Sequence, residues 1–108
     1  MQTKIIAQNI SLSKDQEEQI RAKVEKLATY ADKISDTSSE IKVEISHEHS
    51  KKPEQAYHCV LTIFVPKSVL RAEARMESLR SIVDEVVEKI KTQIEHYKAK
   101  LHHMDERK

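Results

Sequence analysis

The segment AYHCVLTIFV, which spans residues 56–65, is the most strand-like part of the chain. It is rich in β-branched and aromatic residues, the types that pack well on a pleated surface. Alternate positions share one face, and here those positions are Tyr57, Cys59, Leu61, Ile63 and Val65. The opposite face is only partly polar, since it carries Val60 and Phe64 beside His58 and Thr62. The segment therefore predicts a strand whose first face lies in the core.

Shorter segments on either side predict three more strands. Residues 41–46 alternate strictly between apolar and polar side chains, which is typical of a half-buried strand. Residues 69–75 alternate in the same way, with Leu70 and Ala72 on the apolar face. Residues 4–10 form a short strand built on isoleucines. Polar connections are predicted at residues 35–39, 47–55 and 66–68.

Two amphipathic helices are predicted, one after the first strand and one after the last. Ser13 is a suitable N-cap for the first, and Gln16 three residues later completes a capping-box pattern. Its apolar stripe consists of Ile20, Val24, Leu27, Ala31 and Ile34. The second helix spans residues 78–102, with the stripe Leu79, Ile82, Val83, Val86, Ile90, Ile94, Tyr97 and Leu101.

The predicted order of elements is β-α-β-β-β-α, which places the chain in the α+β class. Three consecutive strands favour antiparallel pairing, and both helices can cover the same face of a four-stranded sheet. With 108 residues, we expect a single domain over residues 1–103, followed by a short polar tail at 104–108. The same order resembles that of double-stranded-RNA-binding domains.

Composition excludes several classes of function. The chain contains no glycine, so it lacks P-loops, dinucleotide-binding fingerprints and the G-x-S-x-G nucleophile elbow. Cys59 is the only cysteine, and its position on an apolar face predicts a core residue rather than a nucleophile. His47 and His49 form half a metal site at most, as do His102 and His103. We therefore expect no enzymatic activity, catalytic residue, cofactor, metal or small-molecule substrate.

Charge and hydropathy bear on partners and location. The net charge is only +1, so any binding to nucleic acid must depend on local basic patches. The N-terminus lacks the long apolar region of a signal peptide, and no apolar run is long enough to span a membrane. We expect a cytoplasmic protein with no membrane partner.

The cations of the second helix flank its apolar stripe. Lys89, His96 and Lys100 border one side, and Arg80, Lys91 and Lys98 border the other. These side chains can contact phosphates. They can equally lay their stems over the core while the charge stays in water, or favour the helix dipole. The sequence leaves both interpretations open.

Basic residues outside this helix are equally ambiguous. Lys23 and Lys26 lie on the first helix, which has as many acids as bases. Arg71 and Arg75 lie on the polar face of the fourth strand, where they can extend a basic surface or pair across strands with acids such as Glu44.

Two regions carry a resemblance to a known family. The first is NISLS at residues 9–13, continuing into IRAKVEKLATY at 20–30. The second is LRAEA at 70–74, followed by IVDEVVEKIKTQIEHYKAKL at 82–101. In order and placement they resemble the ribosome hibernation promoting factor family, also called ribosome-associated inhibitors or sigma-54 modulation proteins, in its short form. Departures occur at Ser78, Arg80 and Thr92, where the family often has other residues.

The resemblance implies a translation inhibitor rather than an enzyme. Such a protein binds the small ribosomal subunit and its rRNA in the channel between head and body, where it occupies the space of mRNA and tRNA. It silences idle ribosomes in stationary phase or stress. The residues implied to contact RNA are Lys23, Lys26, Arg75, Arg80, Lys89, Lys91, Lys98 and Lys100.

Other functions stay open at the level of the sequence. The chain could be a general RNA-binding module that also takes free duplexes. It could be a regulatory protein-interaction domain without RNA contact, which the near-neutral charge permits. Self-association through an exposed sheet face with Val60 and Phe64 also stays open.

Overall fold

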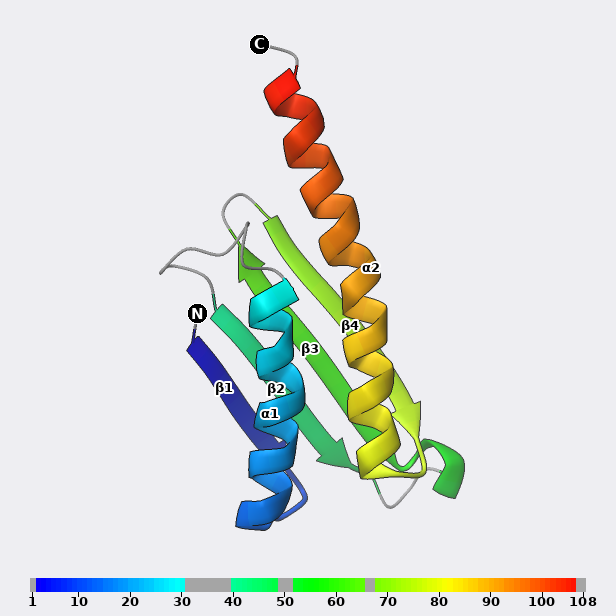
Figure 1. Ribbon diagram of the computed structural model, residues 1–108. Coiled ribbons are helices and arrows are strands. Elements are labelled where there is room, and N and C mark those ends of the chain that lie inside the picture. Colours follow the sequence, from blue (N-terminus) through cyan, green and yellow to red (C-terminus); the bar gives the residue numbers. More distant parts are fainter. Residues whose placement is uncertain (1, 31–39, 49–51, 66–67, 107–108) are drawn as a thin grey trace.

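The protein folds as a four-stranded sheet with both helices on one face (Figure 1). The computed structural model describes residues 2–30, 40–48, 52–65 and 68–106. The elements are β1 (Gln2–Gln8), α1 (Lys14–Tyr30), β2 (Glu40–His47), the short 3₁₀ helix η1 (Pro53–Gln55), β3 (Tyr57–Val65), β4 (Ser68–Met76) and α2 (Leu79–Glu106). The predicted β-α-β-β-β-α order and α+β class are confirmed.

The strands lie in the order of the sequence, β1-β2-β3-β4. β1 and β2 are parallel, so the chain crosses back over the sheet through α1 between them. The other two pairs are antiparallel, as predicted, with Leu61 of β3 opposite both Val43 and Ala72. β3 is therefore an inner strand of the sheet.

The core lies between the helices and the covered face of the sheet. Cys59, Leu61 and Ile63 are fully buried there, as predicted for the first face of β3. Their neighbours in the core are Ile41, Val43, Ile45, Leu70 and Ala72 from the sheet, and Ile20, Val24, Leu27, Ile82, Val83, Val86, Ile90 and Ile94 from the helices.

The open face of the sheet is less apolar than the sequence suggested. Val60, which we expected to be exposed, is only 8% exposed because it lies between the longer side chains of Glu44 and Glu73 on the adjacent strands. Phe64 is 39% exposed, and its cross-strand partner Val69 is 56% exposed. Among the described residues, the most exposed large apolar side chains are thus Phe64 and Val69, which pair at one end of the sheet.

The start of α1 has the predicted capping box. The Gln16 backbone N–H donates to Ser13 Oγ at 3.1 Å, and the Ser13 N–H donates to Gln16 Oε1 at 2.9 Å. β1 ends at Gln8, two residues earlier than predicted, because Asn9 adopts the left-handed conformation with φ 58°. Ala31 and Ile34, predicted for the end of this helix, lie outside the described residues.

α2 is longer than predicted. Ser78 caps its first turn, and the helix continues to Glu106 rather than ending at 102. Its sequence contains neither glycine nor proline to stop it, so residues 104–106 are helical instead of forming a tail. The last turns of α2 extend beyond the end of the sheet (Figure 1).

Helical side chains cover both edges of the sheet. On β4, the Gln93 side chain accepts the Arg71 backbone N–H and donates to the Arg71 carbonyl. Lys89 Nζ donates to the Glu73 carbonyl at 3.1 Å. On β1, Arg21 Nη1 donates to the Thr3 carbonyl at 3.2 Å. These contacts occupy backbone groups that would otherwise offer a template for another strand.

Removal of the Gln93 amide tests this edge contact. We expect Gln93→Ala to lower the free energy of unfolding by about 1 kcal/mol, because two backbone hydrogen bonds of Arg71 lose their protein partner. The matched control is Thr92→Ala at the neighbouring exposed position, where the gain in helix propensity is similar or larger. Urea unfolding followed by circular dichroism measures both. Equal stability of the two variants would contradict the edge role of Gln93.

Candidate nucleic-acid interface

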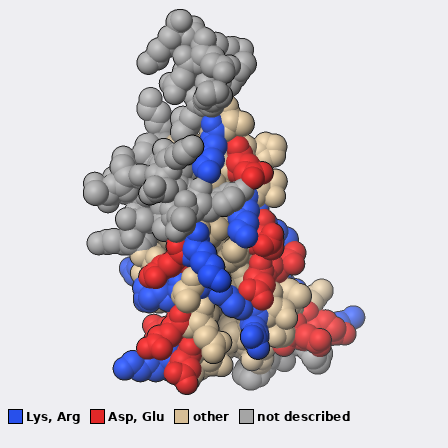
Figure 2. Space-filling view, in the orientation of Figure 1, with Lys and Arg blue, Asp and Glu red and all other residues tan. Residues whose placement is uncertain are grey.

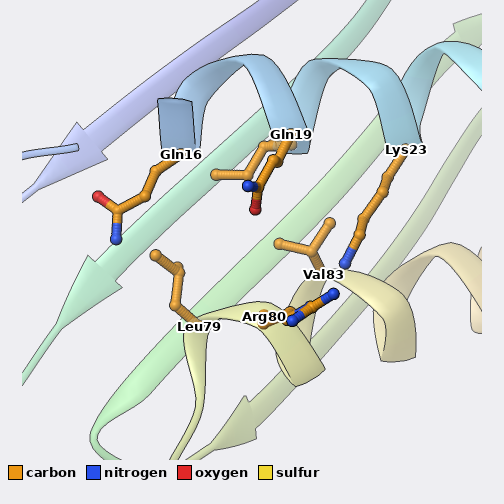
Figure 3. Close-up of a pocket in the computed structure, with 7 residues that line it drawn as sticks. Gln16, Gln19, Lys23, Leu79, Arg80 and Val83 are labelled. Atoms are coloured by element: carbon orange, nitrogen blue, oxygen red, sulfur yellow. The ribbon is translucent and has the colours of Figure 1, made fainter. Parts of the chain in front are cut away.

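α1 and α2 lie side by side on the sheet and leave a groove between them, which we call the interhelix groove. Its first part is lined by Gln16, Gln19, Ile20, Lys23, Leu79, Arg80 and Val83 (Figure 3). Its second part is lined by Lys23, Lys26, Asp84, Val87, Glu88 and Lys91. In the space-filling view, Lys and Arg side chains form a line down the middle of the helical side, with acidic side chains beside it (Figure 2).

Four of the predicted RNA-binding residues meet in this groove. Lys23 and Lys26 come from α1, and Arg80 and Lys91 come from α2. Each helix places them at the border of its buried stripe, and the packing of the two stripes on one sheet brings the borders together. Lys98 follows Lys91 by about two helical turns, so it continues the same side of α2.

Two carboxylates share the groove with these cations. Lys23 Nζ lies 2.9 Å from Asp84 Oδ1, and Lys91 Nζ lies 3.1 Å from Glu88 Oε1. The Asp84 and Glu88 side chains are 61% and 71% exposed. Ion pairs at such exposure are worth about 1 kcal/mol or less, so phosphates can replace these carboxylates at low cost.

Arg80 and Lys26 form no ion pair within the described part of the chain. Arg80 also lies in the first turn of α2, where no acidic residue is present. A cation at this end opposes the helix dipole by roughly 0.3–1 kcal/mol. Its position is therefore unfavourable for the helix itself and leaves its charge available to an anion in the groove.

The remaining predicted residues lie elsewhere. Lys89 faces the β4 edge, where it bonds the Glu73 carbonyl and lies 4.0 Å from Glu85. Lys100 lines a shallow depression between β4 and α2 together with His96 and Tyr97. The predicted set is thus divided among different surfaces instead of forming one.

Arg75 lies on the open face of the sheet, on the opposite side from the groove. It pairs with Glu48 at 3.1 Å. The expected partner Glu44 instead lies 3.6 Å from Lys42, and Arg71 approaches Glu73 at 4.0 Å. Arg71 thus approaches an acid of its own strand, and Arg75 pairs with the residue that follows β2. Neither pairs across strands with Glu44, because β3 lies between β2 and β4.

The open face also holds a histidine–carboxylate contact. His58 Nε2 lies 3.1 Å from Glu73 Oε2. The hydrogen bond with His58, followed by the charge of Arg71, holds the pKa of the Glu73 carboxyl below its ordinary value. The His47 ring packs edge-on against Tyr57 at 4.8 Å between centroids. His49 lies outside the described residues, within which no group of three metal-ligating side chains occurs.

Cys59 is fully buried on the covered face, as predicted for a core residue. Burial raises the pKa of its thiol to about 12. The thiolate form that a nucleophile requires is therefore not populated near neutral pH.

The sequence did not identify several residues that shape the groove. Gln19 and Asp84 carry no motif, and Leu79 was identified only as part of the apolar stripe of α2. Their grouping depends on how the two helices pack. Only Glu88 among these acids could have been linked to a groove cation from the sequence. It precedes Lys91 by three residues, a spacing at which helical side chains can pair.

The chain matches one protein family over nearly its whole length. Residues 3–102 match the family described as Sigma 54 modulation protein / S30EA ribosomal protein. No curated protein matches the sequence.

Within the described residues, no helix is long and apolar enough to cross a membrane.

Two solved structures are similar to this fold. One is the N-terminal domain of Protein Y from Thermus thermophilus, with a TM-score of 0.67 and 19% identity over 87% of this chain and 94% of that one. The other is a ribosomal subunit interface protein from Coxiella burnetii, with a TM-score of 0.68 and 20% identity over 92% and 99%. At these identities they establish the fold.

The balance of charge in the groove is open to test. We expect Asp84→Asn to tighten binding to a polyanion such as heparin by roughly two- to fivefold, because Lys23 loses its competing carboxylate. The matched control is Glu25→Gln, an exposed position on α1 that does not line the groove. Heparin chromatography with a salt gradient compares the two. Equal shifts would show that net charge, not the groove, determines binding.

Proposed function

Because this chain belongs to the Sigma 54 modulation protein / S30EA ribosomal protein family, we propose that it binds the small ribosomal subunit through its interhelix groove. Bound in the channel between head and body, it would occupy the space of mRNA and tRNA. It would thereby keep idle ribosomes inactive in stationary phase or stress.

The family match confirms the resemblance found in the sequence, since it covers nearly the whole chain. The protein is a ribosome-associated modulation factor, not an enzyme, and it acts in translation. A cytoplasmic location is part of the proposal, and membership of a ribosome-associated family supports it. The subunit, the channel and the contacting residues belong to the proposal.

The observation that carries the proposal is the convergence of four cations in one groove of a protein with net charge +1. The positive charges that line this groove outnumber the two negative ones. They belong to Lys23, Lys26, Arg80 and Lys91. A nearly neutral protein can thus present a local positive surface to phosphates while the rest of it stays weakly charged.

Lysine and arginine suit contacts with phosphates because these need charge and reach, not readout of base sequence. Inhibition by occupancy likewise needs no catalytic group. The folded body measures 53 × 26 × 18 Å, an elongated shape that can lie along a channel. The binding would be reversible, as expected of a factor that must later release the ribosome.

Co-sedimentation with purified small subunits at low and high salt tests the proposal. We expect the wild-type protein to pellet with subunits at low salt and to be released at high salt. With four phosphate contacts, the logarithm of the binding constant falls with the logarithm of salt with a slope of roughly −3. A competing free RNA duplex distinguishes ribosome binding from general duplex binding.

Neutralisation of the groove gives the sharper comparison. The triple variant Lys23→Gln, Lys26→Gln and Lys91→Gln should bind at least about tenfold more weakly, with a salt slope reduced by roughly 1 per lysine. The control triple Lys4→Gln, Lys42→Gln and Lys52→Gln removes the same charge outside the groove. Failure of the wild type to pellet at low salt, or equal losses in both triples, would reject the proposal.

A second triple variant defines how far the surface extends. Lys89→Gln, Lys98→Gln and Lys100→Gln remove cations from the β4 side and the far end of α2. We expect a smaller loss than in the groove variant, about threefold, because Lys89 is already held by the Glu73 carbonyl. The same co-sedimentation measures it. A loss as large as that of the groove triple would extend the interface to the far end of α2 or to the β4 edge.

A further inference from the structure

The first part of the interhelix groove is a cleft with a defined shape (Figure 3). Gln16, Gln19 and Lys23 of α1 face Leu79 and Arg80 of α2 across it. The cavity between them has a volume of about 100 Å³. This is below the roughly 300–1,000 Å³ usual for clefts that enclose a small molecule, so the cleft can hold only part of a ligand and leaves the rest outside.

Two cations converge on this cleft from different helices. The Lys23 and Arg80 side chains extend toward one another (Figure 3). Asp84 offsets the charge of Lys23, whereas Arg80 has no ion-pair partner within the described part of the chain and opposes the dipole of α2. An anion bound between the two side chains would give Arg80 an ion-pair partner. It would also offset the unfavourable interaction of Arg80 with the dipole of α2.

The rest of the cleft is unlike a simple phosphate site. Leu79 is half-buried and forms an apolar wall, with the buried Val83 and Ile20 behind it. Gln19 is exposed at the cleft, and its amide has no hydrogen-bond partner within the described part of the chain. Gln16 differs, because its Oε1 is already used by the capping box. A wall and an available amide add nothing to the binding of phosphate alone.

We propose that this cleft binds one unpaired nucleotide of RNA, with its phosphate between Lys23 and Arg80 and its base against Leu79 within reach of the Gln19 amide. An amide offers both a donor and an acceptor, which matches the mixed edge of a nucleobase. The nucleotide must be unpaired because a stacked and paired base cannot enter a cleft. This inference rests on the proposed function and adds a base-binding position to its phosphate contacts.

Nuclear magnetic resonance of the isotope-labelled protein tests the site directly. The probes are a nucleoside 5′-monophosphate, ribose 5-phosphate and inorganic phosphate at matched concentrations. We expect all three to shift the signals of Arg80, and only the nucleotide to shift the Gln19 side-chain amide and the Leu79 methyl groups. Identical shifts from the nucleotide and ribose 5-phosphate would overturn the proposal, as would an absence of shifts in the cleft.

Affinity measurements then identify the source of the nucleotide. By fluorescence anisotropy, Gln19→Ala should weaken binding to short single-stranded RNA about fivefold and leave binding to a duplex unchanged. The control Gln55→Ala removes an exposed amide on η1 and should change neither. Equal loss for duplex and single strand would overturn the unpaired-base assignment. Free nucleotide binding as tightly as single-stranded RNA would overturn RNA as the source.

The experiments can disprove ribosome binding and the nucleotide site independently of each other. Protein that pellets with small subunits but shows no nucleotide-specific shift at Gln19 would disprove the nucleotide site and leave the ribosomal proposal standing. Protein that shows the shift but does not pellet would disprove ribosome binding and leave the nucleotide site intact.

Discussion

The burial of both helices against the same apolar face of the sheet is the interaction on which the rest of the structure depends. Fully buried side chains from α1, α2 and the inner strands form one cluster, and each contributes roughly 1.5–3 kcal/mol. Because the two helices share this face, they must lie next to each other. The groove between them, and the meeting of the cations that border each stripe, follow from that arrangement.

Stability and binding are assigned to different polar groups. Gln93, Lys89 and Arg21 occupy backbone groups at the sheet edges, so these side chains serve the fold. Arg80 and Lys26 have no such partner within the described residues and contribute little to stability. Removal of an edge contact therefore acts on folding, whereas removal of a groove cation acts on binding. The exposed ion pairs Lys23–Asp84 and Lys91–Glu88 have both roles. They add a little to stability, and an incoming anion can displace their carboxylates.

Much of the fold could be predicted from local patterns. The alternation in β2 and β3, the helical stripe of α2 and the capping box at Ser13 each depend on neighbours in the sequence. The predictions of exposure and of ion-pair partners were wrong where residues distant in the sequence lie next to the side chain. Val60 is buried by side chains of two adjacent strands, and Arg75 has Glu48 as its partner on the open face.

The sequence by itself determined the elements, their order, the covered side of β2, β3 and β4, and which cations border the apolar stripe of α2, because periodicity and capping are local properties. The resemblance to a family also lay in the sequence alone. Only the tertiary structure decided which borders face each other. Lys23 and Arg80 are far apart along the chain, yet they meet across one cleft, whereas Lys89 and Lys91 on the same helix turn to different surfaces. The reason is that helix packing on a shared sheet sets distances that no sequence spacing encodes.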